Sequence, residues 1–148
     1  MKPSTRFSDA IHILAFIQVY RDKATLSSET IAQSIGTSSV VVRRLMGKLK
    51  TAHILTTTPG SPDPKLAVDP QKLTLLQIYL IIEGNSQLFT IDPKTNPACI
   101  VGGNIQTVLR HCYQTAEEAA MAKLNQTTLQ DIINAILVHQ AQKEVDKK

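Results

Sequence analysis

The sequence predicts a mainly α-helical fold with one small β-hairpin, and three observations support this prediction. Apolar residues recur at helical spacing along most of the 148-residue chain. The β-branched run at 54–58, the turn-forming segment at 59–64 and the strand-like run at 65–68 together indicate a hairpin. Two short helical patterns joined by a tight turn come directly before it. A helix, a turn, a second helix and a hairpin in this order indicate a winged helix-turn-helix.

The first helix of the motif is expected to begin at a serine and to end at a glycine. Ser27 or Ser28 can accept hydrogen bonds from the unpaired N–H groups at its start, and Glu29 lies in the first turn, where the helix dipole favours negative charge. Gly36 can take the left-handed conformation that ends a helix at low cost. Ser38 can then cap the second helix.

The second helix of the motif has one apolar face and one basic face. Its apolar residues fall at positions i, i+3, i+4 and i+7, on one side of an α-helix: Val42, Leu45, Met46 and Leu49. The opposite side carries Val40, Arg43, Arg44, Gly47 and Lys50. We expect the apolar side to pack on the core and the basic side to remain outside.

The surplus of positive charge is concentrated on this second helix. The formal net charge is +4, and no acidic residue occurs between Thr30 and Pro62, where four basic residues lie: Arg43, Arg44, Lys48 and Lys50. The rest of the chain has equal numbers of acidic and basic residues. A nucleic-acid phosphate backbone is the natural counterpart of such a surface. The alternative is a merely solvated helix face, which the neighbouring turn and hairpin disfavour.

A further helix is predicted on each side of the motif. Residues 10–19 carry apolar side chains on more than one stripe, so this helix should be buried on two sides. Thr74 can cap another helix, which ends at Gly84. No helical pattern occurs at 85–103, which we interpret as a connecting loop.

The last part of the chain is predicted to be helical. A long helix should run from about Asn104 to Leu124. Thr127 or Thr128 can cap a final helix, whose polar end from His139 is expected to fray. A helix of roughly 20 residues is about 30 Å long, more than a small domain can cover. We therefore expect the long helix to pack on a second copy; the alternative is the chain's own first helix.

These patterns divide the chain into three regions. Residues 1–84 are predicted to form the winged helix-turn-helix DNA-binding domain. Residues 85–103 are expected to form a connecting or sensor loop, and residues 104–148 a helical dimerisation region. DNA binding and dimerisation are thus expected in separate parts of one chain.

Several classes of protein are excluded by what the sequence lacks. No apolar run approaches the ~20 residues that cross a bilayer and no secretory signal pattern is present, so we expect a cytoplasmic protein without membrane contact. The two cysteines are too few for a disulfide framework and lack the spacing of a zinc site. Without spaced histidine ligands, a glycine-rich phosphate loop or a nucleophile beside an evident base, an enzyme is not expected.

The N-terminal part of the second helix in such a motif approaches base edges in the major groove. The candidate reading residues are Ser38, Ser39, Val40 and Arg43. Arg43 could donate two hydrogen bonds to guanine O6 and N7. Each residue also has a purely structural interpretation, since serines cap helices and valines pack in cores whether or not DNA is bound.

The predicted backbone contacts lie around this helix. Arg44 and Lys48 are expected to hold phosphates, and Ser28 could donate to a phosphate from the start of the first motif helix. Thr58 and Ser61, at the tip of the wing, would lie along the minor groove or the backbone. The alternative function is a winged-helix protein–protein interaction module, whose basic face meets an acidic partner without sequence-specific DNA binding.

The order and spacing of several short segments resemble one group of bacterial regulators. The segments are 6–14, 29–32, 42–45, 53–56, 75–79 and 96–99. Together they resemble the IscR/NsrR/CymR ("Rrf-two") family of winged-helix transcriptional regulators, and within it the YwnA-like subgroup. The resemblance implies a homodimer joined through the long helix, which binds a palindromic double-stranded operator, usually as a repressor. Family members commonly have an acid at the position of Arg43, so the resemblance does not imply which operator this chain would bind.

The resemblance also bears on cofactors and signals. Many family members hold an iron–sulfur cluster through three cysteines in the loop before the long helix. This chain has Cys99 alone in that loop and Cys112 inside the predicted helix, so no cluster is expected. Cys99 could instead be a redox-sensitive thiol, with Lys94 as the nearest group to lower its pKa. An unknown small-molecule or protein effector of the same loop is the alternative.

Overall fold

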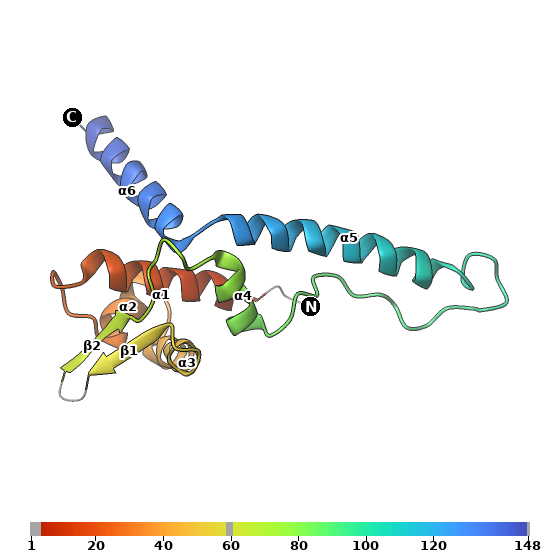
Figure 1. Ribbon diagram of the computed structural model, residues 1–148, viewed down its shortest axis with the longest axis horizontal. Coiled ribbons are helices and arrows are strands. Elements are labelled where there is room, and N and C mark those ends of the chain that lie inside the picture. The colour runs from red at the N-terminus through yellow and green to blue at the C-terminus, as the bar shows by residue number, and fades with distance from the viewer. Residues whose placement is uncertain (1–3, 59–60, 148) are drawn as a thin grey trace.

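The computed structural model describes residues 4–58 and 61–147, with the backbone alone at Ser61 and Pro62. The described residues form helices and a two-stranded antiparallel sheet in this order: α1 (Arg6–Tyr20), α2 (Ser28–Ile35), α3 (Ser39–Thr51), β1 (Leu55–Thr58), β2 (Ser61–Leu66), α4 (Leu75–Glu83), α5 (Ile105–Gln126) and α6 (Leu129–Asp146). Figure 1 shows a head, made of α1 to α4 and the hairpin, and an arm, made of α5 and the segment 85–104.

The head is assembled around α1, which contacts α2, α3, α4, α6 and β2. Its fully buried aliphatic side chains, Ile13, Leu14 and Ile17, meet Leu45 and Ile78 in a single apolar cluster. Burial of one such side chain stabilises a fold by about 1.5–3 kcal/mol. The expectation that the first helix is buried on more than one side is confirmed.

Local capping fixes the ends of the two motif helices. Ser27 Oγ accepts a hydrogen bond from the Thr30 N–H at 3.1 Å, and Ser38 Oγ accepts one from the Val41 N–H at 3.4 Å. Gly36 ends α2 with a φ of 84°, and its N–H donates to the Ala32 carbonyl. These contacts confirm the predicted helix, tight turn and second helix.

The wing differs from the sequence prediction. Strand β2 begins at Ser61, inside the segment 59–64 that we expected to be a turn or loop. Thr57 pairs with Pro64 and Thr58 with Ser61, with a register shift between the two pairs. Prolines fit here because each strand of a two-stranded sheet has a free edge, and a bulge accommodates the irregular pairing.

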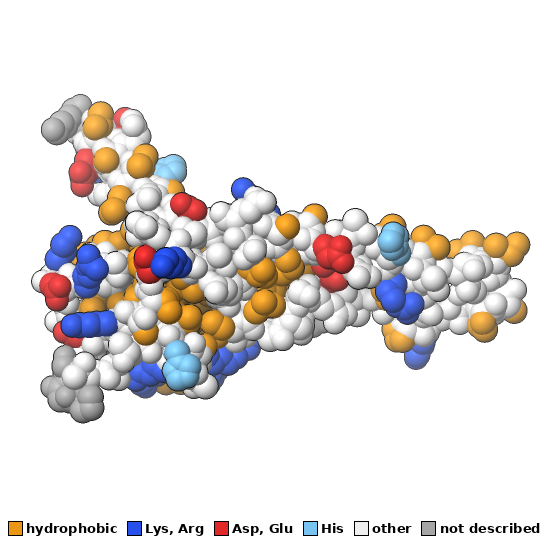
Figure 2. Space-filling model, viewed as in Figure 1, with side chains coloured by type: hydrophobic (Ala, Val, Ile, Leu, Met, Phe, Trp, Pro, Cys, Tyr) orange, Lys and Arg blue, Asp and Glu red, His pale blue; other side chains and the backbone are white. Residues whose placement is uncertain are grey.

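The arm begins after α4, and hydrogen bonds and an aromatic contact hold its extended segment against α5. The Glu117 carboxylate accepts hydrogen bonds from the backbone N–H groups of Leu88 and Phe89. The Phe89 ring lies 5.2 Å from the Tyr113 ring, measured between centroids. Helix α5 has no buried residue, and its main contacts with the head are to α4 rather than α1. In Figure 2, apolar side chains are visible along the arm as far as its tip.

Helix α6 returns to the head and is longer than expected. Leu129 and Ile133 belong to the same buried cluster as α1. The helix continues to Asp146, so the fraying expected from His139 onward is not observed over 139–146. Side-chain hydrogen bonds one turn apart support this polar end, from Gln140 to Glu144 and from Gln142 to Asp146. No helix in the described part of the chain is long and apolar enough to cross a membrane.

The anchoring of α6 in the head leads to a stability prediction. We expect Leu129→Ala to lower the free energy of unfolding by about 2–5 kcal/mol, because Leu129 is fully buried and its truncation leaves a cavity. Val145→Ala, on the exposed end of the same helix, should have little effect. Urea unfolding followed by circular dichroism, at one protein concentration, measures the free energy of unfolding of each variant. Equal losses in the two variants would contradict the anchoring of α6 in the head.

Candidate DNA interface

Helix α3 turns one face into the head and the opposite face outward. Val42, Leu45 and Leu49 are buried. With 3.6 residues per turn, the line opposite them runs close to Val40 and Gly47. Arg43 and Arg44 lie roughly 50° to either side of this line. Val40 is 54% exposed and both arginines are exposed, so the predicted outward face is open.

The hydrogen bonds of Arg43 bring residues of two helices together. Arg43 Nη1 lies 3.3 Å from Ser28 Oγ and 3.5 Å from Glu29 Oε1. The side chains of Arg43 and Glu29 are 55% and 66% exposed, so the ion pair contributes about 0–1 kcal/mol to stability. Sequence reasoning grouped Ser28 and Arg43 in one interface but did not include Glu29.

The other predicted serines are placed close to the start of α3. Ser38 is exposed, and its hydroxyl is engaged in the helix cap. Ser39 is half-buried as the first residue of α3. Ser38 therefore has the structural role that we had set beside base reading, and its backbone stays close to the outward face.

Lys48 lies to one side of the outward face. Its Nζ donates a hydrogen bond to the Ile82 carbonyl at 3.4 Å, near the C-terminal end of α4. Such an end carries unpaired carbonyls and a partial negative charge, which attract a lysine. Lys48 thus links α3 to α4, and Arg44 is the more open of the two predicted phosphate-binding residues.

A groove lies between the start of α2, the outer side of α3 and strand β1 of the wing. It has a volume of about 450 Å³, and its lining residues include Ser28, Glu29, Arg43, Lys50 and Thr57. Thr58 is exposed at the end of β1. The side chain of Ser61 lies outside the described residues. Figure 2 shows Lys and Arg side chains along the lower edge of the head, where α3 lies in Figure 1.

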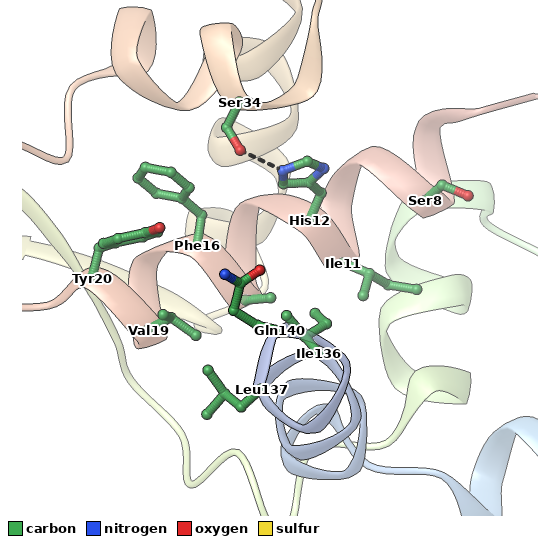
Figure 3. A pocket seen from close by; sticks show the side chains of 11 residues that line it. Ser8, Ile11, His12, Phe16, Val19, Tyr20, Ser34, Ile136, Leu137 and Gln140 are labelled. Atoms are coloured by element: carbon green, nitrogen blue, oxygen red, sulfur yellow. Dashed lines mark hydrogen bonds between the residues drawn. The ribbon is translucent and has the colours of Figure 1, made fainter. Parts of the chain in front are cut away.

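A second groove lies between α1 and α6, with a volume of about 500 Å³ (Figure 3). Its walls are largely apolar, with Val19 on α1 turned toward Leu137 on α6 and the Phe16 ring lying beside the Tyr20 ring. His12 lines it and is half-buried, with its Nε2 2.8 Å from Ser34 Oγ, so it is a packed histidine as we interpreted it. The sequence did not indicate this groove, because its lining comes from three helices far apart in the chain.

Cys99 lies exposed in the loop before α5. Hydrogen bonds from the backbone N–H of Gly102 and, to a lesser extent, of Val101 hold the pKa of the Cys99 thiol below its ordinary value. The predicted helper Lys94 is not a cause of this lowering, which corrects the sequence expectation. The turn packs closely, since a Cβ at Gly102 would meet the Asn96 carbonyl oxygen.

The chain is similar to a known family of regulators and to a named relative. Residues 3–135 match the model of the Rrf2 family, described as an iron-dependent transcriptional regulator. The chain is 38% identical over 131 residues to YwnA of Bacillus subtilis (strain 168), named as a candidate HTH-type transcriptional regulator; the match covers 88% of this chain and 96% of YwnA.

Solved structures show the same fold. One, described as a candidate DNA-binding protein, is 37% identical with a TM-score of 0.68, over 86% of this chain and 98% of that one. CymR (YrzC), the global cysteine regulator of B. subtilis, is 20% identical with a TM-score of 0.68, over 90% of this chain and 97% of CymR. These likenesses confirm the winged fold with a long helix and the resemblance that the sequence indicated.

The donor set of this chain does not fit the iron that the family description names. No group of three or more His, Cys, Asp or Glu side chains that could hold a metal occurs among the described residues. Cys99 and Cys112 are both exposed, one on the loop and one on α5. Clusters and iron sites need several such ligands, so no metal chemistry is assigned to these residues.

The backbone contacts of Cys99 can be tested by alkylation. In a Cys112→Ser variant, we expect the alkylation rate of Cys99 to rise at a lower pH in the folded protein than in urea. A lowered pKa means that the reactive thiolate forms at lower pH, and unfolding removes the two N–H donors. Stopped-flow alkylation across pH measures both midpoints; coincident midpoints would contradict the assignment.

Proposed function

Since this chain belongs to the Rrf2 family of transcriptional regulators, we propose that it binds a palindromic DNA operator as a homodimer and represses transcription. The family consists of transcriptional regulators, which confirms the prediction that the protein is not an enzyme. We also propose a cytoplasmic location, which the proposed double-stranded DNA ligand supports. The repressor role follows the sequence resemblance, and the observation that carries DNA binding is the outward face of α3.

Each residue of this face has a role in the proposed complex. Val40 would contact a thymine methyl group, and Arg43 would read a guanine in the major groove. Arg44 would hold a phosphate, and so would Lys48 once its Nζ leaves the Ile82 carbonyl. Further contacts to bases or backbone are proposed for Ser28, Ser38, Ser39, Thr58 and Ser61.

The homodimer is supported by the unburied surface of α5. This helix of 22 residues is about 33 Å long, and it has no buried residue. Val108 is 57% exposed, and small residues follow it along the helix: Ala116, Ala119 and Ala120. Two copies packed along α5 would bury this surface and hold two heads for two half-sites of one operator. We propose that regions 1–84, 85–103 and 104–148 serve as head, sensor loop and dimerisation region. Within the last region, Leu129 and Ile133 of α6 pack into the core of the head.

We further propose that Cys99 receives the signal. Its thiol is exposed and its pKa is lowered, so an oxidant or electrophile reaches a reactive group in the segment that joins the head to α5. An effector that binds the loop without reacting would meet the same segment. A footprint on the DNA upstream of the protein's own gene, before and after thiol oxidation, tests both the operator and the signal.

Substitutions on α3 should separate base reading from phosphate binding. We expect Arg43→Ala to weaken specific binding by ~1–3 kcal/mol and to relax sequence preference, because a base contact is lost. Arg44→Ala should weaken binding to every duplex and lower the salt slope by about one. Lys48→Ala should change the slope less, since Nζ is turned toward α4. DNA-binding titrations at several salt concentrations measure the affinity and the salt slope of each variant. Lys143→Ala, which removes a positive charge from α6, is the control. Affinities and slopes equal to those of the wild type in all α3 variants would contradict these assignments.

The dimer can be tested on α5. We expect Val108→Glu to shift the protein from dimer to monomer at micromolar concentration and to abolish operator binding, because a charge would be buried in the contact. Val145→Glu, an equally exposed position near the end of α6, is the matched control. Sedimentation velocity measures the mass of each. A dimer unaffected by Val108→Glu would place the contact elsewhere.

A further inference from the structure

One acidic side chain stands at the edge of the otherwise basic face of α3. Glu29 Oε1 lies 3.5 Å from Arg43 Nη1, while Ser28 Oγ donates to Glu29 Oε2 at 3.4 Å. Ser28 Oγ also accepts from Arg43 Nη1 at 3.3 Å. The three side chains thus form a closed set in which each contacts the other two.

The contacts leave one edge of the Arg43 guanidinium unused. All of its hydrogen bonds within the described chain pass through Nη1. The Nε–H and one Nη2–H point in parallel from the other edge of the planar group. Such a fork of two donors matches the O6 and N7 acceptors of guanine. The closed set therefore holds the arginine by one nitrogen and presents the edge that can read a base.

Stability accounts for only part of this arrangement, because Glu29 lies in the first turn of α2, where the helix dipole favours a negative charge, and that role does not require a contact with Arg43. The ion pair is largely exposed, so it adds little to the folded state. The start of α2 is already capped by Ser27, whose Oγ accepts the Thr30 N–H. Glu29 also places a negative charge beside the surface that would meet phosphates, which weakens binding to any duplex.

We propose that Glu29 is a specificity-determining positioning residue, which together with Ser28 orients Arg43 for base reading and lowers affinity for non-cognate DNA. Holding a flexible arginine in its reading orientation before binding reduces the ordering that a cognate contact requires. The negative charge opposes binding to every sequence, and only cognate DNA offsets this cost, through the guanine contact of the Arg43 side chain that Glu29 orients. This inference rests on the proposed DNA-binding function.

The test compares two duplexes. The cognate duplex is one that the wild-type protein selects from a random library, and the non-cognate duplex replaces each guanine of its half-sites by adenine. We expect Glu29→Gln to lower the ratio of the two affinities by up to about fivefold. An exposed ion pair is worth up to about 1 kcal/mol, which corresponds to a factor of about five in affinity. Affinity for the non-cognate duplex should rise at the same time, since a negative charge is removed. Glu29→Asp, which keeps the negative charge, should lower the ratio of the two affinities less than Glu29→Gln does.

A double-mutant cycle checks that Glu29 acts through Arg43. Arg43→Lys removes the fork, so adding Glu29→Gln to it should cause no further loss of discrimination. Glu144→Gln, an exposed carboxylate on α6, is the matched control, and the melting temperature of each variant is recorded.

The outcomes separate this inference from the proposed function. If the wild-type protein selects no sequence, the proposed function fails and the inference fails with it. If it selects a sequence and Glu29→Gln leaves the ratio unchanged, or weakens both duplexes equally, the positioning role alone is overturned. A lower ratio with an unchanged melting temperature and no additional loss in the double variant supports it.

Discussion

The burial of three aliphatic side chains of α3, Val42, Leu45 and Leu49, is the constraint from which the interface follows. Because these residues fill the core against α1, the opposite side of a 3.6-residue helix must face outward. That side carries Arg43 and Arg44, and no acidic residue of the same helix offsets them. The same packing that stabilises the head therefore determines which residues can meet DNA.

The arm follows a different rule. A helix of 22 residues without a buried side chain is not explained by the core of its own chain. Its contacts are with the extended segment before it, through Glu117 and Tyr113, and with α4. The chain thus combines a head with a complete core and an arm whose apolar surface a second copy would cover.

Sequence reasoning succeeded where structure is set locally. Ser27, Gly36 and Ser38 have their predicted roles, because a cap depends on residues within one helical turn. The predicted start of β2 was wrong, because the prolines were interpreted as residues that end a strand. A strand with a free edge tolerates proline. The Glu29–Arg43 pair and the α1–α6 groove join residues far apart in sequence, so no local pattern could reveal them.

The junction between arm and head shows why the two parts cannot be considered separately. Near the end of α4, the Ile82 carbonyl accepts a hydrogen bond from Lys48 of α3, and Glu83 pairs with Arg6 of α1 at 3.1 Å. Gly84 then ends the helix with a φ of 82°, and the segment that contains Cys99 follows. Helix α4 also contacts α5. The arm is thus joined to the head at both ends of α4. The Leu75 N–H donates to the Thr127 carbonyl at one end, and the segment 85–104 begins at the other end, where the Ile82 carbonyl is bonded to α3, the helix that carries the candidate reading residues.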